Sequence, residues 1–284
     1  MKWEGGRRGG GIEDRRGSGG GKGAVAGGGI GALVIAGVLY FFLGVDPQTS
    51  QQIAGQLGQL GNAGDQDGQR GTPEDEAGLF VDVIGTNINE VWAQQMPGYR
   101  APTTVLYTQG TQTGCGYGQA AMGPFYCPAD NNVYLDLSFW RDLQNLGGSG
   151  ADFAKAYVIA HEFGHHVQAL SGATDRVQRA QQSLPKAQGN RYSVALELQA
   201  DCYAGVWAKN AAVVSNGEVV VTAADLEEGM KTAAAIGDDA LQSRSGGRVS
   251  PESFTHGSSQ ERMQWLNRGY QTGDANSCDT FANL

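Results

Sequence analysis

The chain has 284 residues, 45 of them glycine, and a formal net charge of −9 at pH 7. The first 45 residues contribute +3, from six basic and three acidic side chains, so the remainder carries −12. Such an acidic remainder argues against nucleic acid and anionic lipid headgroups as ligands.

An uncharged stretch near the amino terminus is the first predicted element. Residues 24–45 contain no charged side chain, and this length suffices for a transmembrane helix. The preceding tail, 1–23, is basic, so the positive-inside rule places it in the cytoplasm. A cleaved signal peptide is the rival interpretation, but Phe42 to Pro47 lacks an A-x-A-like pair of small residues. We therefore expect a single-pass protein of the bacterial cell membrane, with its carboxy-terminal part periplasmic or extracellular.

The next segment, 46–76, is rich in Gln, Gly, Asp and Asn and has few large apolar residues. This composition predicts a flexible linker. The remaining residues, 77–284, are ample for one domain with its own core. Within it, 103–107 and 132–138 have strand-like patterns. Together with the helices predicted further along the chain, they indicate an α+β domain in which a small sheet packs on mainly α-helices.

Four cysteines allow three pairings. We expect Cys115 to pair with Cys127, closing a short loop, and Cys202 to pair with Cys278, holding the carboxy-terminal tail against a helix. Disulfides fit an exported domain. A cysteine-ligated zinc is the alternative, but the sequence contains no C-x-x-C. Reduced, buried cysteines would apply if the predicted topology were wrong.

The segment His161-Glu162-Phe163-Gly164-His165-His166 contains the pattern H-E-x-x-H. On a helix, His161 and His165 lie on one face and can bind one zinc ion, while Glu162 lies about 100° round the helix and can act as general base. We predict such a helix, with Ser149 as N-cap and Gly172 at its end. A chance match is the alternative. His166 is rotated away from the shared face and is expected to pack or to lie behind the ligands.

Zinc in a catalytic site has three protein ligands and one open position, so a third ligand is expected further along the chain. A second helix is predicted over 191–210, after a break at 185–190. It carries Glu197 and Asp201 four residues apart, on one face. One carboxylate can bind the zinc while the other orients an imidazole. A solvated acidic face is the alternative, although these acids lie among apolar residues. Further helices are predicted over 223–240 and 261–270, the latter with a capping box of Ser258 and Glu261.

His161-Glu162-x-x-His165 followed by Glu197-x-x-x-Asp201 is similar to the gluzincin arrangement. Three longer segments, 161–168, 197–205 and 254–262, resemble the bacterial neutral zinc metallopeptidase family, and the likeness covers roughly residues 75 to 284 plus the glycine-rich amino-terminal part. The resemblance implies a gluzincin-like fold and one catalytic Zn²⁺. It implies that Glu197 is the third ligand and that Asp201 hydrogen-bonds a zinc-ligating histidine.

By the same resemblance, His256 stabilises the oxyanion of the transition state, and Arg262 holds its loop. A surface histidine is an equal alternative, and His256 could also occupy the open zinc position and keep the enzyme latent. Peptidases of this architecture can pair an edge strand with an extended substrate, and Val133 to Leu137 is a candidate for that strand. A buried core strand would show the same pattern.

The sequence thus predicts a membrane-anchored zinc metallopeptidase, by default an endopeptidase, that acts on proteins or peptides of the cell envelope. Two alternatives remain. One is a zinc-stabilised scaffold or chaperone-like module without catalysis, which would have no need of Glu162. The other is a metal-dependent amidase that acts on cell-wall peptides.

Overall fold

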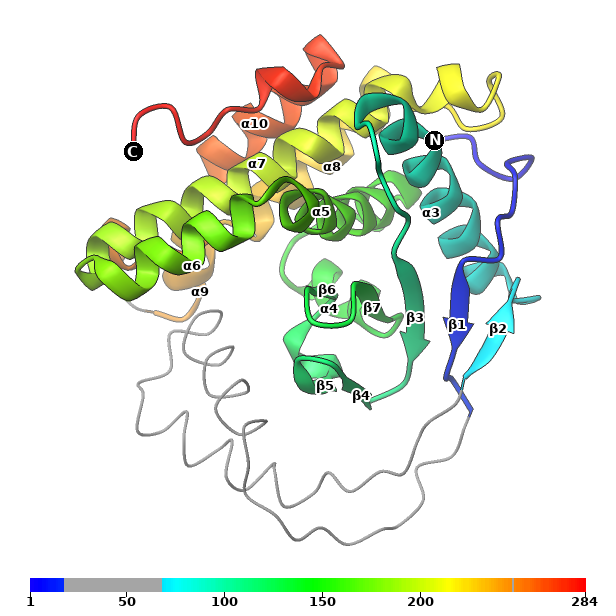
Figure 1. Ribbon diagram of the computed structural model, residues 1–284, viewed down its shortest axis with the longest axis horizontal. Helices are drawn as coiled ribbons and strands as arrows, with labels where there is room; N and C mark the ends of the chain where they lie inside the picture. Colours follow the sequence, from blue (N-terminus) through cyan, green and yellow to red (C-terminus); the bar gives the residue numbers. More distant parts are fainter. Residues whose placement is uncertain (18–67, 247) are drawn as a thin grey trace, which may run out of the picture. The chain divides into compact units, whose positions relative to one another are not determined.

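The computed structural model describes residues 1–17, 68–246 and 248–284 (Figure 1). These residues divide into a helical unit and a sheet unit. The helical unit comprises Met1–Gly11, Thr72–Pro102 and Trp140–Leu284. The sheet unit comprises Thr103–Phe139 and the described part of Ile12–Gly71. Helices and strands are both present, which confirms the α+β class.

The sheet unit contains a five-stranded mixed sheet and a separate two-stranded hairpin. The order in the larger sheet is β2-β1-β3-β7-β6, with β3 parallel to β1 and β7, and with both outer strands antiparallel to their neighbours. The hairpin is β4-β5. The strands are β1 (Ile12–Asp14), β2 (Gln69–Gly71), β3 (Thr103–Tyr107), β4 (Gly110–Thr113), β5 (Gly116–Gln119), β6 (Phe125–Cys127) and β7 (Asn132–Asp136).

A small apolar cluster holds the sheet unit together. Its buried members are Val105, Tyr107, Cys127 and Tyr134, and Cys115 packs against them. The disulfide between Cys115 and Cys127 confirms the predicted pairing. It joins the end of β6 to the turn between β4 and β5.

The predicted edge strand is not at an edge. β7 pairs with β3 over its whole length, and its residues Asn132–Tyr134 also pair with β6 on the other side. The prediction that Val133 to Leu137 form a substrate-binding edge strand is therefore wrong for this part of the strand, because the backbone groups that a peptide would need are already used. Leu137 lies beyond the end of β7.

The helical unit is built around the longest helix, α7. Four other helices pack on α7, namely α5, α10, α6 and α3. The largest fully buried side chains of the helical unit include Trp92, Trp207, Phe153 and Tyr157. The helices are α3 (Glu76–Gln95), α5 (Asp152–Ser171), α6 (Ala173–Ser183), α7 (Lys186–Val214), α8 (Ala223–Ala235), α9 (Asp238–Arg244) and α10 (Ser259–Thr272), and α4 (Phe139–Asn145) begins at the boundary of the two units.

Several predicted helix ends need correction. The N-cap of α5 is Ala151 and not Ser149. The Ser149 hydroxyl instead accepts a hydrogen bond from the backbone N–H of Ala151. The predicted end at Gly172 is confirmed. α7 begins at Lys186, directly after Pro185, since proline is well accommodated before the first turn, where no N–H donor is needed. The helix predicted over 223–240 is two helices, because the chain leaves helical geometry at Ile236 and Gly237.

Two close contacts fix α10 against α7. Gly269 of α10 approaches the α7 backbone so closely that a Cβ at this position would lie 1.9 Å from the Cys202 carbonyl oxygen. The Cys202–Cys278 disulfide, as predicted, ties the carboxy-terminal tail to α7. The capping box of Ser258 and Glu261 at the start of α10 is also confirmed.

The amino-terminal segment Met1–Gly11 belongs to the helical unit. Lys2 forms an antiparallel bridge with Val220, and Trp3 packs edge-on against Phe80 of α3. β2 falls inside the range predicted as linker. None of the helices in the described residues is long and apolar enough to cross a membrane. The predicted anchor, 24–45, lies outside the described residues.

Candidate metal centre

The predicted zinc-binding residues come together where α5 crosses α7. His161 and His165 lie in the middle of α5, and Glu197 lies in the middle of α7. The two helices approach closely because Gly164 faces Ala200: a Cβ on Gly164 would lie 3.0 Å from the Ala200 Cα. The short distance between the backbones lets side chains from both helices reach one point.

Three ligand atoms from these helices converge. One atom each of His161, His165 and Glu197 lies within 4.8 Å of the other two. His161 Nε2 is 3.1 Å from Glu197 Oε2, and His165 Nε2 is 3.5 Å from Glu197 Oε1. Around a tetrahedral zinc ion with bonds of about 2.0–2.1 Å, ligand atoms are roughly 3.3 Å apart. Two imidazoles and a carboxylate at these distances fit zinc.

The second ring nitrogen of each histidine is held by another side chain. His161 Nδ1 is 2.9 Å from Asp201 Oδ1, and His165 Nδ1 is 2.8 Å from Gln168 Oε1. Since carboxylate and amide oxygens accept hydrogen bonds, both Nδ1 atoms donate, and both Nε2 lone pairs are left for a metal. Gln168 is itself fixed, because its amide donates to the Leu196 carbonyl at 2.6 Å.

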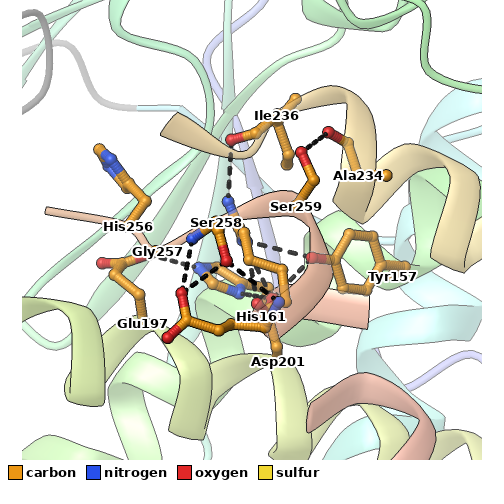
Figure 2. Close-up of polar contacts among 12 residues, drawn as sticks. Tyr157, His161, Glu197, Asp201, Ala234, Ile236, His256, Gly257, Ser258 and Ser259 are labelled. Atoms are coloured by element: carbon orange, nitrogen blue, oxygen red, sulfur yellow. Dashed lines mark hydrogen bonds and ion pairs between the residues drawn. The ribbon is translucent and has the colours of Figure 1, made fainter. Parts of the chain in front are cut away.

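Asp201 is the centre of a buried polar network (Figure 2). Besides His161, its carboxylate accepts from the Tyr157 hydroxyl at 2.6 Å and from Arg262 Nε at 2.8 Å. The contact with Arg262 lowers the pKa of the Asp201 carboxyl to about 2, against the effect of burial. Asp201 is therefore ionised and orients His161, in the position that the sequence predicted for it.

The electrostatics of the site suit a cation. Burial alone would lower the pKa of His161, but the carboxylates of Asp201 and Glu197 raise it to about 10. Glu197 is also buried, yet the imidazole of His165 and the other neighbouring histidines lower its pKa. For His165 burial prevails, and its pKa is lowered. Without metal, the carboxylates retain a proton on His161, so a divalent cation must compete with that proton.

Glu162 is buried beside these ligands and, among the described residues, is not part of the group that could hold a metal ion. It directly follows His161 on α5, and its role as general base stays a prediction. His166 is also buried, but its Nε2 is 2.6 Å from the Arg100 carbonyl oxygen and its ring packs against Tyr99. It packs away from the ligands, as predicted.

His256 lies on the loop that precedes α10, where the sequence placed it. It does not belong to the metal-binding group found among the described residues, and Figure 2 shows its ring apart from His161. Its Nδ1 is 3.1 Å from Asp238 Oδ1, and Asp238 Oδ2 accepts from the backbone N–H groups of Thr255 and His256, both at 2.7 Å. Burial opposes protonation, but the hydrogen bond to Asp238 and the charge of Glu197 raise the pKa of His256.

Three site residues were missed from the sequence: Tyr157, Gln168 and Asp238. Tyr157 precedes His161 by four positions and Gln168 follows His165 by three, so helix periodicity could have identified both. Asp238 lies on a separate helix, and nothing in the local sequence connects it to His256.

The comparisons with known proteins agree with this geometry. The family described as "Putative neutral zinc metallopeptidase" matches residues 1–281. The protein YpfJ of Escherichia coli (strain K12), described as uncharacterized, is 44% identical over 295 residues, covering 99% of both chains. The protein Rv2575 of Mycobacterium tuberculosis (strain H37Rv), also described as uncharacterized, is 44% identical over 209 residues, covering 71% of this chain and 70% of its own. No solved structure matches the chain significantly. The chain therefore belongs to the neutral zinc metallopeptidase family.

Proposed function

We propose that this protein is a zinc-dependent endopeptidase of gluzincin type that cleaves proteins or peptides of the cell envelope. The observation that carries the proposal is the convergence of His161 Nε2, His165 Nε2 and the Glu197 carboxylate, with both Nδ1 atoms held by other side chains. Zinc bound there would polarise the substrate carbonyl and lower the pKa of water. The general base and the hydrogen-bond donor to the oxyanion are side chains of this protein.

Glu162 is the general base in this proposal. It takes a proton from the water whose oxygen attacks the peptide carbonyl carbon, and it delivers that proton to the amine as the C–N bond breaks. His256, whose pKa is raised by its contact with Asp238, donates a hydrogen bond to the carbonyl oxygen as negative charge develops there. The two disulfides support an oxidising compartment outside the cytoplasm as the place of action.

A Glu162→Gln variant tests this function. The amide cannot accept the proton, so we expect zinc affinity to remain within a few fold of the wild type while peptide hydrolysis falls by about 10²–10⁴-fold. The measurements are zinc competition with a chelator and cleavage of a broad peptide library, with Glu227→Gln on the exposed face of α8 as matched control. Equal cleavage by Glu162→Gln and wild type would exclude the peptidase mechanism. Zinc binding without any cleavage would favour a scaffold, and digestion of peptidoglycan alone would favour an amidase.

A further inference from the structure

Arg262 is a buried cation next to the candidate metal centre. Its side chain forms a fork on Asp201, with Nε 2.8 Å from Oδ2 and Nη2 3.0 Å from Oδ1. Nη2 also lies 3.2 Å from the Tyr157 hydroxyl, and Nη1 donates to the Ile236 carbonyl at 3.3 Å. One guanidinium thus connects α10 with α7, α5 and the end of α8.

These contacts determine the orientation of Asp201. Its Oδ1 accepts from His161 Nδ1, the Tyr157 hydroxyl and Arg262 Nη2, and its Oδ2 accepts from Arg262 Nε. The carboxylate cannot rotate without breaking several charge-assisted hydrogen bonds. This carboxylate orients the His161 ring. The direction in which His161 Nε2 points therefore depends on Arg262, acting through Asp201. A lysine offers a point charge and cannot reproduce the planar fork.

We propose, building on the zinc function above, that Arg262 is a positioning residue for the metal: it locks Asp201 so that His161 presents Nε2 to zinc. The test is Arg262→Lys in the full chain, with Arg268→Lys as matched control. Arg268 lies on the same helix, is exposed, and contacts the Ser277 carbonyl and Trp265. Zinc affinity is measured by chelator competition, thermal unfolding of the metal-free protein reports on folding, and kcat and KM are measured on a cleaved peptide.

For Arg262→Lys we expect zinc affinity to fall by about 10–100-fold, as for other residues behind metal ligands, with kcat reduced and KM little changed. Arg268→Lys should behave like the wild type in each assay. Arg262→Met should bind zinc more weakly than Arg262→Lys. A higher zinc affinity in Arg262→Lys than in Arg262→Met would show that the positive charge alone supplies part of the stabilisation. A folded Arg262→Lys protein with wild-type zinc affinity overturns the proposal. If wild type binds zinc but cleaves nothing, the peptidase function fails while the affinity measurement still decides the role of Arg262.

A second, independent observation concerns the amino-terminal segment. Trp3 is 8% exposed, and its indole N–H donates to Asp152, the first residue of the zinc-site helix α5, at 3.0 Å. Lys2 and Val220 exchange two backbone hydrogen bonds of 3.0 Å each. Further along, the Gly9 and Gly10 N–H groups donate to side chains of α3. The segment is thus an integral part of the helical unit.

The next residues enter the sheet unit in the same way. Ile12–Asp14 form β1, paired with β3 on one side and with β2 on the other. These strand contacts and the contacts of Trp3 require that the segment and the folded domain share a compartment. A tail on the cytoplasmic face of a membrane could not make them with a domain on the opposite face.

We propose that residues 1–14 lie in the same compartment as the zinc ligands. The charge of the tail had instead predicted that the tail and the carboxy-terminal domain lie on opposite sides of the membrane. The test uses two single-cysteine additions in the full chain, Arg8→Cys and Val213→Cys. Arg8 is an exposed residue of the amino-terminal segment, and Val213 of α7 is 70% exposed. A membrane-impermeant maleimide is added to intact spheroplasts or after their lysis.

We expect both cysteines to react under the same condition, and both before lysis if the domain faces outward. The wild-type chain, whose four cysteines are all in disulfides, should stay unlabelled. Labelling of Val213→Cys in intact spheroplasts together with labelling of Arg8→Cys only after lysis would overturn the proposal.

Discussion

The contact between Asp238 and His256 sets the protonation of the residue to which we assign transition-state stabilisation. Asp238 accepts the His256 ring N–H and the backbone N–H groups of Thr255, His256 and Gly257, so removing its charge removes the main support for the imidazolium. The folded pKa of His256 is raised, so the charged form is present below that pKa and is lost as the pH rises through it. A donor role therefore predicts loss of activity on the alkaline side.

Asp238→Asn should move this alkaline limb to lower pH, because His256 loses a direct charge partner that raises its pKa. The measurement is kcat/KM against pH, with Asp175→Asn on α6, an exposed carboxylate, as control. An unchanged alkaline limb in Asp238→Asn would show that His256 is not the group that titrates.

At the residue scale, helix periodicity predicts the residues of the candidate metal centre from the sequence, whereas residues held only by tertiary contacts are missed. His161 and His165 are four residues apart, and so are Glu197 and Asp201. The structure brings His161, His165 and Glu197 together, and Asp201 contacts the other ring nitrogen of His161. Asp238 reaches His256 because α9 begins beside the loop before α10. No spacing rule joins residues of two such elements.

Among the elements, the packing of α10 on α7 carries the network behind the metal. Gly269→Ala would place a methyl group 1.9 Å from the Cys202 carbonyl oxygen, so the helices must move apart. Alanine favours helices over glycine by about 1 kcal/mol, but overpacking costs about 1–3 kcal/mol, and contact with backbone atoms falls at the upper end or beyond.

We therefore expect Gly269→Ala to be destabilised in chemical denaturation and to bind zinc more weakly, because α10 carries Arg262. Gln264→Ala, at an exposed position of α10, should leave both quantities unchanged. Wild-type zinc affinity in Gly269→Ala would mean that the position of α10 does not matter to the metal.

Element prediction succeeded where the signal is local. The core of each zinc-site helix, the end at Gly172 and the capping box of Ser258 arise from short patterns, and all three are present. Strand pairing is not local: the alternation in 132–138 identifies a strand but cannot show that β6 covers one side of it. Likewise, the basic composition of the tail says nothing of the tertiary contacts that Trp3 makes.

For the whole molecule, the two disulfides serve different units. Cys115 and Cys127 are 12 residues apart in the sheet unit, whereas Cys202 and Cys278 are 76 apart in the helical unit that contains the candidate metal centre. Loop-closure entropy predicts a stabilisation of about 3 kcal/mol for the first and about 4.5 kcal/mol for the second. The longer loop should therefore matter more to stability.

Replacing each pair by alanines separates these contributions. The Cys202 and Cys278 double variant should show the greater loss in denaturant unfolding and also a weaker zinc affinity, because Cys202 directly follows Asp201 on α7 and the Gln199 amide donates to the Cys278 carbonyl at 3.0 Å. The Cys115 and Cys127 double variant should lose stability while its zinc affinity stays at the wild-type level. If both variants lost zinc affinity equally, the two units would unfold as one, and the metal centre would depend on the sheet unit as much as on its own helices.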